Sequence, residues 1–402
     1  MRPSFKIVID KGSIMAFVLN VILLCGLLPS YGIIIVSALL ANWLLLFVEI
    51  LAILILFIQH KYHVGIIFSG KWQIVLFCFY SFIVTVFNLN SNPQRVSHIY
   101  WISIVFIAFG ISYIVGHFVH NKTVADNFTR NESFYLLLYF SIIFFNFISN
   151  FSIKTASTAA ASYYLLTLLP FVFCLRKKVF KILLIILVGV GCLVSLKRGA
   201  FIAYALCLLA YFYINSGSKK TLRVKRILQI AFLLLIGIEL LLLLQDFFGL
   251  NIIERLGNIG EDGGSYRSYI YATVWQRFID SPLEYKVFGR GFNAVRYSLG
   301  IQTGFLMDSN TVSAHNDFLE VLIDYGLIGA MLYISFVFCK IKVCFKAVRD
   351  NHEHAAAMVT SIIIFLMISL VSHLIIYPSY IINLLAFWVI YENVYMTEIS
   401  IT

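Results

Sequence analysis

Residues 162–214 read SYYLLTLLPFVFCLRKKVFKILLIILVGVGCLVSLKRGAFIAYALCLLAYFYI. They form three apolar runs, at 162–175, 179–195 and 199–214, joined by short turns that carry Lys and Arg. With tilt and interfacial ends, each run is close to the length that an α-helix needs to cross about 30 Å of hydrocarbon. The stretch therefore predicts helices that cross a bilayer one after another.

The same pattern extends along the chain in both directions, and we expect about twelve spans in all. The others lie near 13–28, 31–58, 73–88, 99–118, 134–151, 227–248, 325–343, 356–376 and 379–395. The run at 31–58 fits one tilted helix or two short helices broken near Asn42. The predicted fold is an all-α, polytopic integral membrane helical bundle.

Composition supports a protein that is solvated by lipid. The chain has 402 residues, of which 61% are hydrophobic and 12% charged, whereas a soluble domain is about 45–50% apolar and about 25% charged. The net charge of +11 comes from clusters between apolar runs, as in cytoplasmic loops. These features exclude a soluble enzyme, a disordered regulator and a nucleic-acid partner, and they make the bilayer itself a partner.

Charge sidedness predicts the topology. Placing the N-terminus inside puts most of the 30 Lys and Arg residues in short cytoplasmic loops. Both termini are then cytoplasmic, and the first apolar run, which lacks a cleavage site, is an anchor. We expect helices 1–9 over residues 1–248, a large outward-facing loop over 249–317, and helices 10–12 over 318–402.

The large loop has helical content of its own. Apolar side chains recur every three to four residues, which predicts an amphipathic helix lying on the membrane or on the bundle. These side chains are Tyr266, Ile270, Val274, Trp275 and Phe278. Because long loops in membrane proteins are more often functional than mere spacers, we expect the chemistry here.

Lys197 and Arg198 stand in a minimal outer turn, Ser195 to Gly199, against the positive-inside trend. Either they face a negatively charged ligand, or their side chains extend to lipid headgroups. The two alternatives stay open on the residues alone.

Two loop arginines follow or adjoin glycines. Arg267 follows Gly263 and Gly264, and Arg290 lies between two glycines in VFGRGFN, residues 287–293. A guanidinium offers a planar set of donors that suits phosphate oxygens. The alternative for Arg267 is an ordinary pairing with Glu261 or Asp262.

His315 and Asn316 precede a predicted helix start at about 316–318, where Asp317 and Glu320 resemble a capping box. The positive end of the helix macrodipole disfavours imidazolium, so His315 is expected to be neutral and able to accept a proton. A histidine that merely ends a helix at the interface is the alternative.

Gly326 and Gly329 are three residues apart on that helix. They would let a neighbouring helix approach closely and fix the position of His315.

Ionisable residues within the predicted spans have two explanations. Glu239, Asp324 and His373 could form the proton relay of a secondary transporter, as could the acid Glu49. Alternatively, Asp324 and Glu320, four residues apart on one face, pair with Arg198 or Arg267. We favour pairing, because polar features gather on one side of the predicted bundle and no internal repeat is apparent.

Together these motifs resemble the bacterial O-antigen ligase and polymerase family. The resemblance rests on Ser195-x-x-Arg198, on GRGF at 289–292 after Ser281-Pro282, and on His315-Asn316-x9-Gly326-x-x-Gly329. It covers about residues 195–330. It implies a twelve-span bacterial inner-membrane glycosyltransferase with a large periplasmic loop.

The resemblance also implies roles for individual residues. His315 would be the catalytic base, and Arg198 and Arg267 would bind the diphosphate of an undecaprenyl-diphosphate-linked oligosaccharide donor. On its residues alone, Arg290 is a further candidate for diphosphate binding. The supporting residues would be Lys197, Asn316, Gly326 and Gly329. No Asp-x-Asp motif or Cys/His cluster appears, so we expect inverting transfer that needs no metal and no cofactor.

Two acceptors fit this chemistry. A polymerase would extend a glycan with the next repeat unit, and a ligase would transfer the glycan to lipid A-core. We favour the polymerase on the stretch VFGRGFN, and the catalytic residues do not separate the two.

Overall fold

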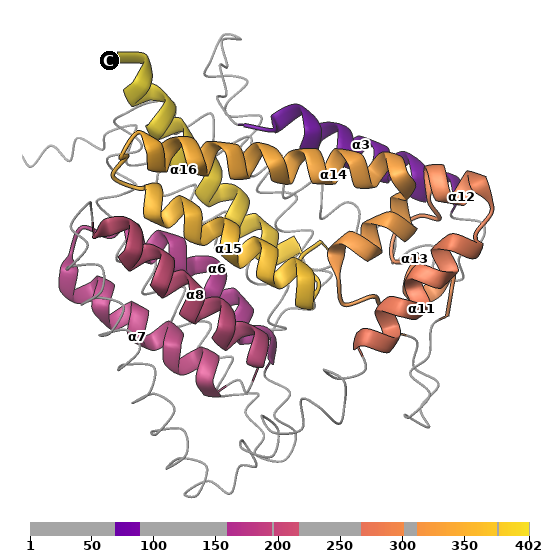
Figure 1. Cartoon of the computed structure of the whole chain (residues 1–402), viewed down its shortest axis with the longest axis horizontal. Coiled ribbons are helices and arrows are strands. Elements are labelled where there is room, and N and C mark those ends of the chain that lie inside the picture. The colour runs from indigo at the N-terminus through magenta and orange to yellow at the C-terminus, as the bar shows by residue number, and fades with distance from the viewer. Residues whose placement is uncertain are drawn as a thin grey trace, which may run out of the picture.

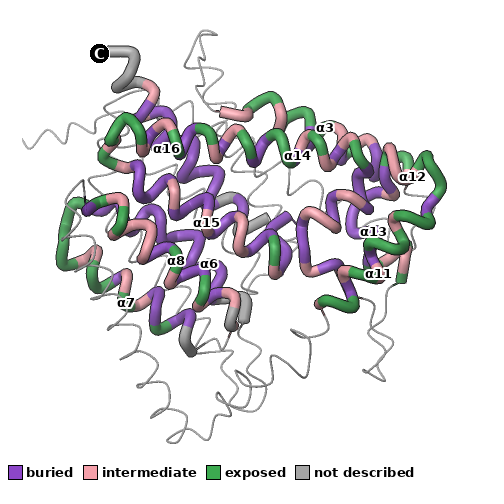
Figure 2. The backbone as a smooth tube through the Cα atoms, viewed as in Figure 1, coloured by how far each residue is buried: buried purple, intermediate pink, exposed green. Residues whose placement is uncertain are grey.

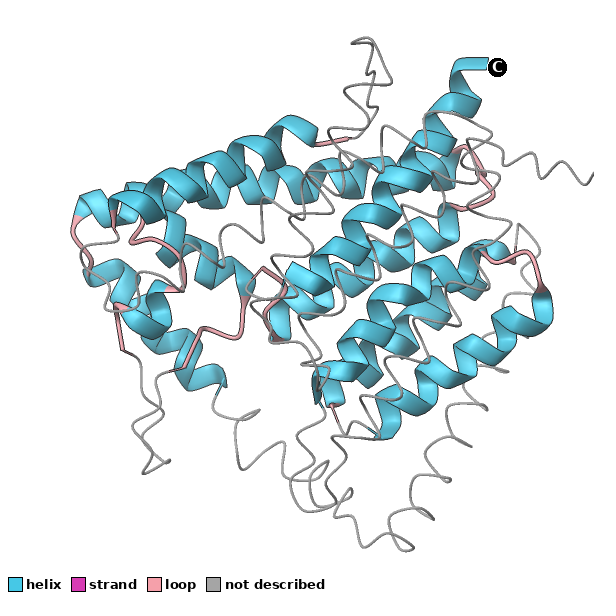
Figure 3. Ribbon diagram, turned by 180° about the vertical axis from the view of Figure 1, so that it is seen from behind, coloured by secondary structure: helices cyan, strands magenta, loops and turns pink. Residues whose placement is uncertain are grey.

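A computed structural model describes residues 69–88, 159–194, 197–216, 267–300, 312–375 and 378–401. All regular elements in these segments are helices, and no strand occurs in them (Figure 3). The helices are α3 (Lys71–Phe87), α6 (Ala159–Cys174), α7 (Lys178–Val194), α8 (Arg198–Asn215), α11 (Arg267–Asp280), α12 (Leu283–Phe288), α13 (Ala294–Tyr297), α14 (Asp317–Arg349), α15 (Ala355–Val371) and α16 (Pro378–Ile401).

The apolar runs predicted from 73 to 88, from 162 to 214 and from 325 to 395 all coincide with helices. Among the described helices, α14 is the one long and apolar enough to cross a membrane by length and composition, and α3, α15 and most of α6 and α8 are shorter apolar helices. The remaining runs lie outside the described residues. The number of about twelve spans therefore stays a prediction.

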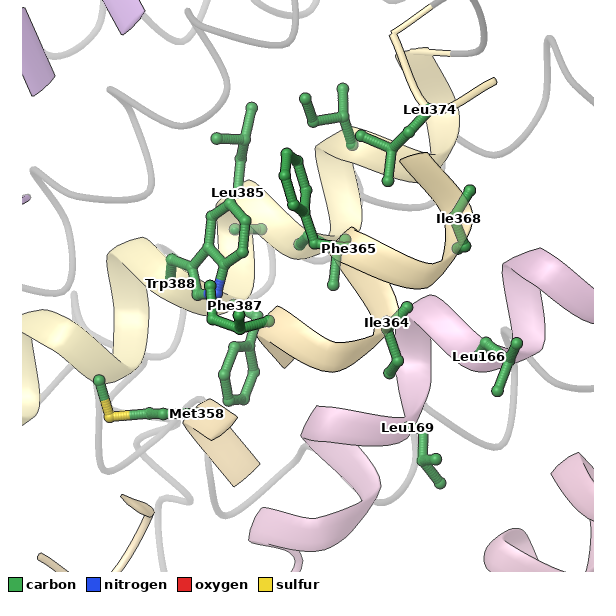
Figure 4. Packing of buried hydrophobic residues seen from close by; sticks show 14 of the residues in the cluster. Leu166, Leu169, Met358, Ile364, Phe365, Ile368, Leu374, Leu385, Phe387 and Trp388 are labelled. Atoms are coloured by element: carbon green, nitrogen blue, oxygen red, sulfur yellow. The ribbon is translucent and has the colours of Figure 1, made fainter. Parts of the chain in front are cut away.

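The main core forms around α15, which packs against α8, α14, α6 and α16. The sequence of α15 is apolar on all sides and begins with three alanines, and such a helix is expected to be buried among others. Figure 4 shows its residues Ile364, Phe365 and Ile368 among side chains of α6 and α16. Trp388 of α16 donates a hydrogen bond to Ser361 of α15 at 2.6 Å. Figure 2 shows α6, α15 and α16 mostly buried, whereas α7 exposes one side.

A second, smaller core belongs to the predicted large loop. The short helices α11, α12 and α13 gather around the beginning of α14 (Figure 1). α11 buries Ile270 and Val274 in this core, whereas Trp275 is half-exposed. The predicted amphipathic helix is therefore present, and it packs on the protein.

α14 lies beside α3 and breaks at Gly326, which has φ 64° and ψ −167° (Figure 1). The expectation that Gly326 and Gly329 share one regular helix face is wrong, because the break separates them. A Cβ at Gly326 would overlap the backbone of Val287 and Gly289, and one at Gly289 would overlap the backbone of Asp324 and Tyr325. The close neighbour of Gly326 is thus the end of α12 and the turn that follows it.

Candidate active site

His315 lies directly before α14 in a left-handed backbone conformation, with φ 53°. Asn316 caps the helix, since its side chain accepts hydrogen bonds from the backbone N–H groups of Phe318 and Leu319 at 3.0 and 3.2 Å. The predicted helix start is confirmed. The capping residue, however, is Asn316 and not Asp317, because only Asn316 precedes the first helical turn.

Three buried carboxylates on the first turns of α14, those of Asp317, Glu320 and Asp324, hold backbone segments in place. Asp317 accepts from the N–H groups of Leu374 and Ile375, and Glu320 accepts from that of Ala314 at 2.7 Å. These bonds fix the segments that lead into His315 and out of α15.

Asp324 accepts from the backbone N–H groups of Asn293 and Ala294, at 2.6 and 2.7 Å. Neither Asp324 nor Glu320 forms an ion pair with Arg267 in the described part of the chain, and the side chain of Arg198 lies outside it. The predicted pairing with Arg267 is wrong, because the carboxylates bind backbone N–H groups instead. These bonds also occupy both oxygens of Asp324, which disfavours a proton relay.

Two cationic side chains lie close enough to His315 to shift its ionisation. Burial, followed by the positive charges of Arg267 and Lys197, lowers the pKa of His315 from 6.5 to about 4. The ring is therefore neutral at pH 7, as predicted, with burial and two cations as its causes. A neutral imidazole can accept a proton.

Lys197 is the N-cap residue of α8, and its ammonium lies 4.7 Å from the centre of the Tyr163 ring. Burial and then the charge of Arg267 lower the pKa of Lys197 from 10.5 to about 8. Two cations from segments 70 residues apart in sequence thus create a positive potential at one histidine. Arg198 is the first residue of α8, and its side chain lies outside what the structure describes.

Two further residues contact His315. The ring of His373, which follows α15, has its centroid 4.3 Å from that of His315. The Tyr271 hydroxyl lies 3.0 Å from the carbonyl oxygen of His315 and 2.8 Å from that of Leu370. Sequence reasoning missed Tyr271, which lies four residues after Arg267 on the same face of α11. It considered His373 only as part of a relay.

Arg290 has a different environment. Its guanidinium donates to the Ser281 hydroxyl at 3.0 Å and lies 4.1 Å from the centre of the Tyr285 ring. It is not among the cations that lower the pKa of His315. Its backbone N–H donates to the carbonyl of Ile323, beside the break in α14. These contacts favour a role in the structure of the loop.

A comparison of the sequence with models of protein families shows which family the chain resembles. A model described as O-antigen ligase matches residues 182–334. The resemblance seen in the sequence is confirmed. No curated protein matches the chain.

The matched segment contains every site residue predicted from the sequence, from Lys197 to Gly329. Members of this family are bacterial membrane proteins, and the match supports an O-antigen ligase or polymerase type of function in surface polysaccharide assembly. It implies a glycosyltransferase-like enzyme that uses glycan and lipid-linked substrates. His373 lies beyond the matched segment, although its ring contacts His315.

The described residues contain no group of three or more His, Cys, Asp and Glu side chains that could bind a metal. They do combine a neutral histidine with two cations at the beginning of a helix. Such a site can accept a proton and stabilise a negatively charged group next to it.

Proposed function

We propose that this protein is an inner-membrane glycosyltransferase that joins undecaprenyl-diphosphate-linked repeat units into a surface polysaccharide. The observation that carries the proposal is the neutral, partly buried His315 close to the positive charges of Arg267 and Lys197. A base next to two cations matches a reaction in which a hydroxyl loses a proton while a diphosphate leaves.

In the proposed reaction, the acceptor hydroxyl attacks C1 of the donor sugar and its proton passes to His315. The bond between C1 and the diphosphate oxygen breaks, and the diphosphate leaves with the bonding electron pair. Direct displacement inverts the anomeric centre. Arg198, Arg267 and Lys197 would neutralise the leaving group, and we propose that this charge makes a divalent ion unnecessary.

The proton acceptor and the cations come from separate segments, so the loop must be folded for the site to form. Tyr271 supports this assembly, since its hydroxyl lies within hydrogen-bonding distance of the carbonyls of both His315 and Leu370. Arg290 supports it indirectly through the segment packed against Gly326.

The acceptor is either a growing glycan or lipid A-core. We propose the polymerase first. The ligase is the second candidate, favoured by the description of the matching family model. The stretch at 287–293 that suggested a polymerase packs against the break in α14, so it bears on loop structure more than on acceptor choice.

Purified protein incubated with a lipid-linked repeat-unit donor tests the function. A polymerase converts this donor alone into a ladder of longer lipid-linked glycans, and a ligase produces a glycosylated product only when lipid A-core is added. The His315→Ala variant is the control, because it loses the base while Asn316 still caps α14. No product with either acceptor, or activity of His315→Ala within about threefold of the parent, would contradict the proposal.

We also propose the twelve-span topology, with residues 249–317 periplasmic and both termini cytoplasmic. Single cysteines at Ser298 and Asn351, both exposed, test it in a Cys-less background. A membrane-impermeant thiol reagent applied to intact spheroplasts should label Ser298→Cys and not Asn351→Cys. The reverse pattern would overturn the topology.

A further inference from the structure

A polar cavity lies at the opposite end of α15 from His315. It has a volume of about 630 Å³ and is bordered by the end of α6, the beginning of α7, the end of α8 and the beginning of α15. Figure 1 shows these four helix ends gathered away from α11 and α13. Because α15 has 17 residues, the cavity and His315 are separated by roughly 25 Å.

The cavity has cations at its rim and aromatic rings in its wall. Arg176 and Lys181 line it, together with Phe173 and Tyr211. The rings of Phe173 and Tyr211 are stacked, with centroids 4.0 Å apart and planes 11° apart. The Lys181 ammonium lies 3.4 Å from the Tyr211 hydroxyl. The aromatic pair therefore holds Lys181 at the cavity.

The pKa of His354 shows how the charged groups around the cavity act on its interior. Burial lowers its pKa from 6.5 to about 4, Glu353 raises it, and His352, Lys181 and Arg176 lower it further. Both cations therefore act on the cavity interior, and His354 is neutral at pH 7. A neutral histidine can donate one hydrogen bond to an anion.

We propose that this cavity, the cationic pocket, binds the phosphate group of an acidic phospholipid. Two positive charges and one negative charge, that of Glu353, leave it net positive. Its aromatic wall suits the apolar part of the same molecule. In the proposed topology this end faces the cytoplasm, where basic pockets between helices bind anionic headgroups. The inference goes beyond the glycosyl transfer, because the pocket is remote from His315.

The sequence offers a matched control. Arg176, Lys177, Lys178 and Lys181 form one basic cluster, but only Arg176 and Lys181 line the pocket. Lys177 and Lys178 are exposed, as is Arg176, so the two pairs differ in whether they line the pocket. The double variants Arg176→Ala/Lys181→Ala and Lys177→Ala/Lys178→Ala lose the same charge, so they separate binding in the pocket from general attraction to a basic surface.

The experiment is a thermal-shift titration of the full-length protein in phosphatidylcholine nanodiscs. The ligands are short-chain phosphatidylglycerol, short-chain phosphatidylcholine and glycerol phosphate. We expect phosphatidylglycerol to bind most tightly and Arg176→Ala/Lys181→Ala to weaken it about thirtyfold, at roughly tenfold per 1.4 kcal/mol and a contribution of about 1 kcal/mol for each cation. The control variant should stay within about threefold of the parent.

Glu353→Gln gives a test in the opposite direction and does not depend on the stability of the double variants. Removing the acid should tighten phosphatidylglycerol binding by up to about fivefold. Equal weakening by the two double variants, unchanged affinity in Glu353→Gln, or equal binding of phosphatidylcholine would overturn the proposal. Glycerol phosphate binding as tightly as phosphatidylglycerol would overturn the lipid assignment in favour of a soluble phosphate ester.

Discussion

The imidazole rings of His315 and His373 pack against each other, with their centroids 4.3 Å apart and their planes 37° apart. His373 is buried. The two rings therefore share one contact at the site. The packing of His373 helps to exclude water from His315 and to fix its orientation.

We predict that His373→Phe keeps most of the activity, because a phenyl ring can preserve this packing. His373→Ala should lose about 10- to 100-fold in kcat, since a base displaced by about an ångström loses rate on that scale. The acid limb of the pH–rate profile should move up in His373→Ala, as water reaches His315. Equal, severe defects in both variants would show that a nitrogen of His373 takes part directly.

The pH dependence of kcat/KM should be bell-shaped. His315 works as a base only when deprotonated, so the rate should fall as the pH drops through its lowered pKa of about 4. Lys197 stabilises an anion only when protonated, so the rate should fall again as the pH rises through about 8. Lys197→Arg should remove the alkaline limb, because arginine stays charged.

The acid limb of kcat should lie at a higher pH than that of kcat/KM. A bound diphosphate is negatively charged and favours imidazolium, so it raises the pKa of His315 in the complex. Arg267→Gln should likewise raise the acid limb of kcat/KM, because it removes a positive charge from beside the ring. Arg290→Gln is the control and should leave this limb in place. An acid limb at about 6.5 in the parent would contradict the environment of His315.

Arg198 and Arg267 are predicted to share one diphosphate. Lysine keeps the charge but loses the bidentate donors, so Arg198→Lys and Arg267→Lys should each lose about 10- to 1,000-fold in kcat/KM. The double variant should be less impaired than the product of the two single defects, because both arginines act on one leaving group. If the defect of the double variant equals the product of the two single defects, Arg198 and Arg267 do not share one diphosphate. Contact of Arg198 with lipid headgroups would then be favoured.

The local parts of this structure could be predicted from the sequence. Apolar runs located the described helices of the bundle, the spacing of Ile270 and Val274 located α11, and the residues around Asn316 located the beginning of α14. Each depends on neighbours within a few positions along the chain. Such patterns can be recognised in a single sequence.

The long-range relationships could not be predicted in the same way. Asp324 binds the backbone N–H groups of Asn293 and Ala294, and a backbone partner leaves no trace in side-chain identity. His373 contacts His315 across 58 positions, which no spacing rule specifies. Gly326 occurs in a pattern typical of close helix packing, whereas its backbone conformation ends one helical piece and begins another.

This break in α14 should be sensitive to a single methyl group. Gly326 has a φ/ψ combination that is almost restricted to glycine, and a Cβ there would overlap the backbone of Val287 and Gly289. Gly326→Ala should lose more than about 3 kcal/mol of stability or fail to accumulate. Gly300→Ala is the control, because Gly300 has φ 57° and no atom within 4 Å of its added Cβ, and it should cost about 1–2 kcal/mol. Equal stability of the two variants in thermal unfolding would argue against the backbone contact at the break.

Lys340 of α14 and Glu392 of α16 form a buried ion pair with an N–O distance of 2.7 Å. The second carboxylate oxygen of Glu392 accepts from the backbone N–H of Ser69, directly before α3. The Lys340 ammonium also lies 5.5 and 5.4 Å from the ring centres of Phe336 and Trp388. The pair therefore connects three segments in an apolar environment, and sequence reasoning missed it.

Removing one partner of the Lys340–Glu392 ion pair should lower the free energy of unfolding more than removing the charges of both partners. Lys340→Met leaves a carboxylate buried without its counter-ion and should destabilise the protein by about 3–5 kcal/mol. The double variant Lys340→Met/Glu392→Gln should recover much of this loss, because the glutamine is uncharged and its amide oxygen still accepts from Ser69. Thermal unfolding of the purified variants in one detergent measures both effects. A double variant at least as unstable as Lys340→Met would mean that the positive charge of Lys340 serves a purpose other than balancing Glu392.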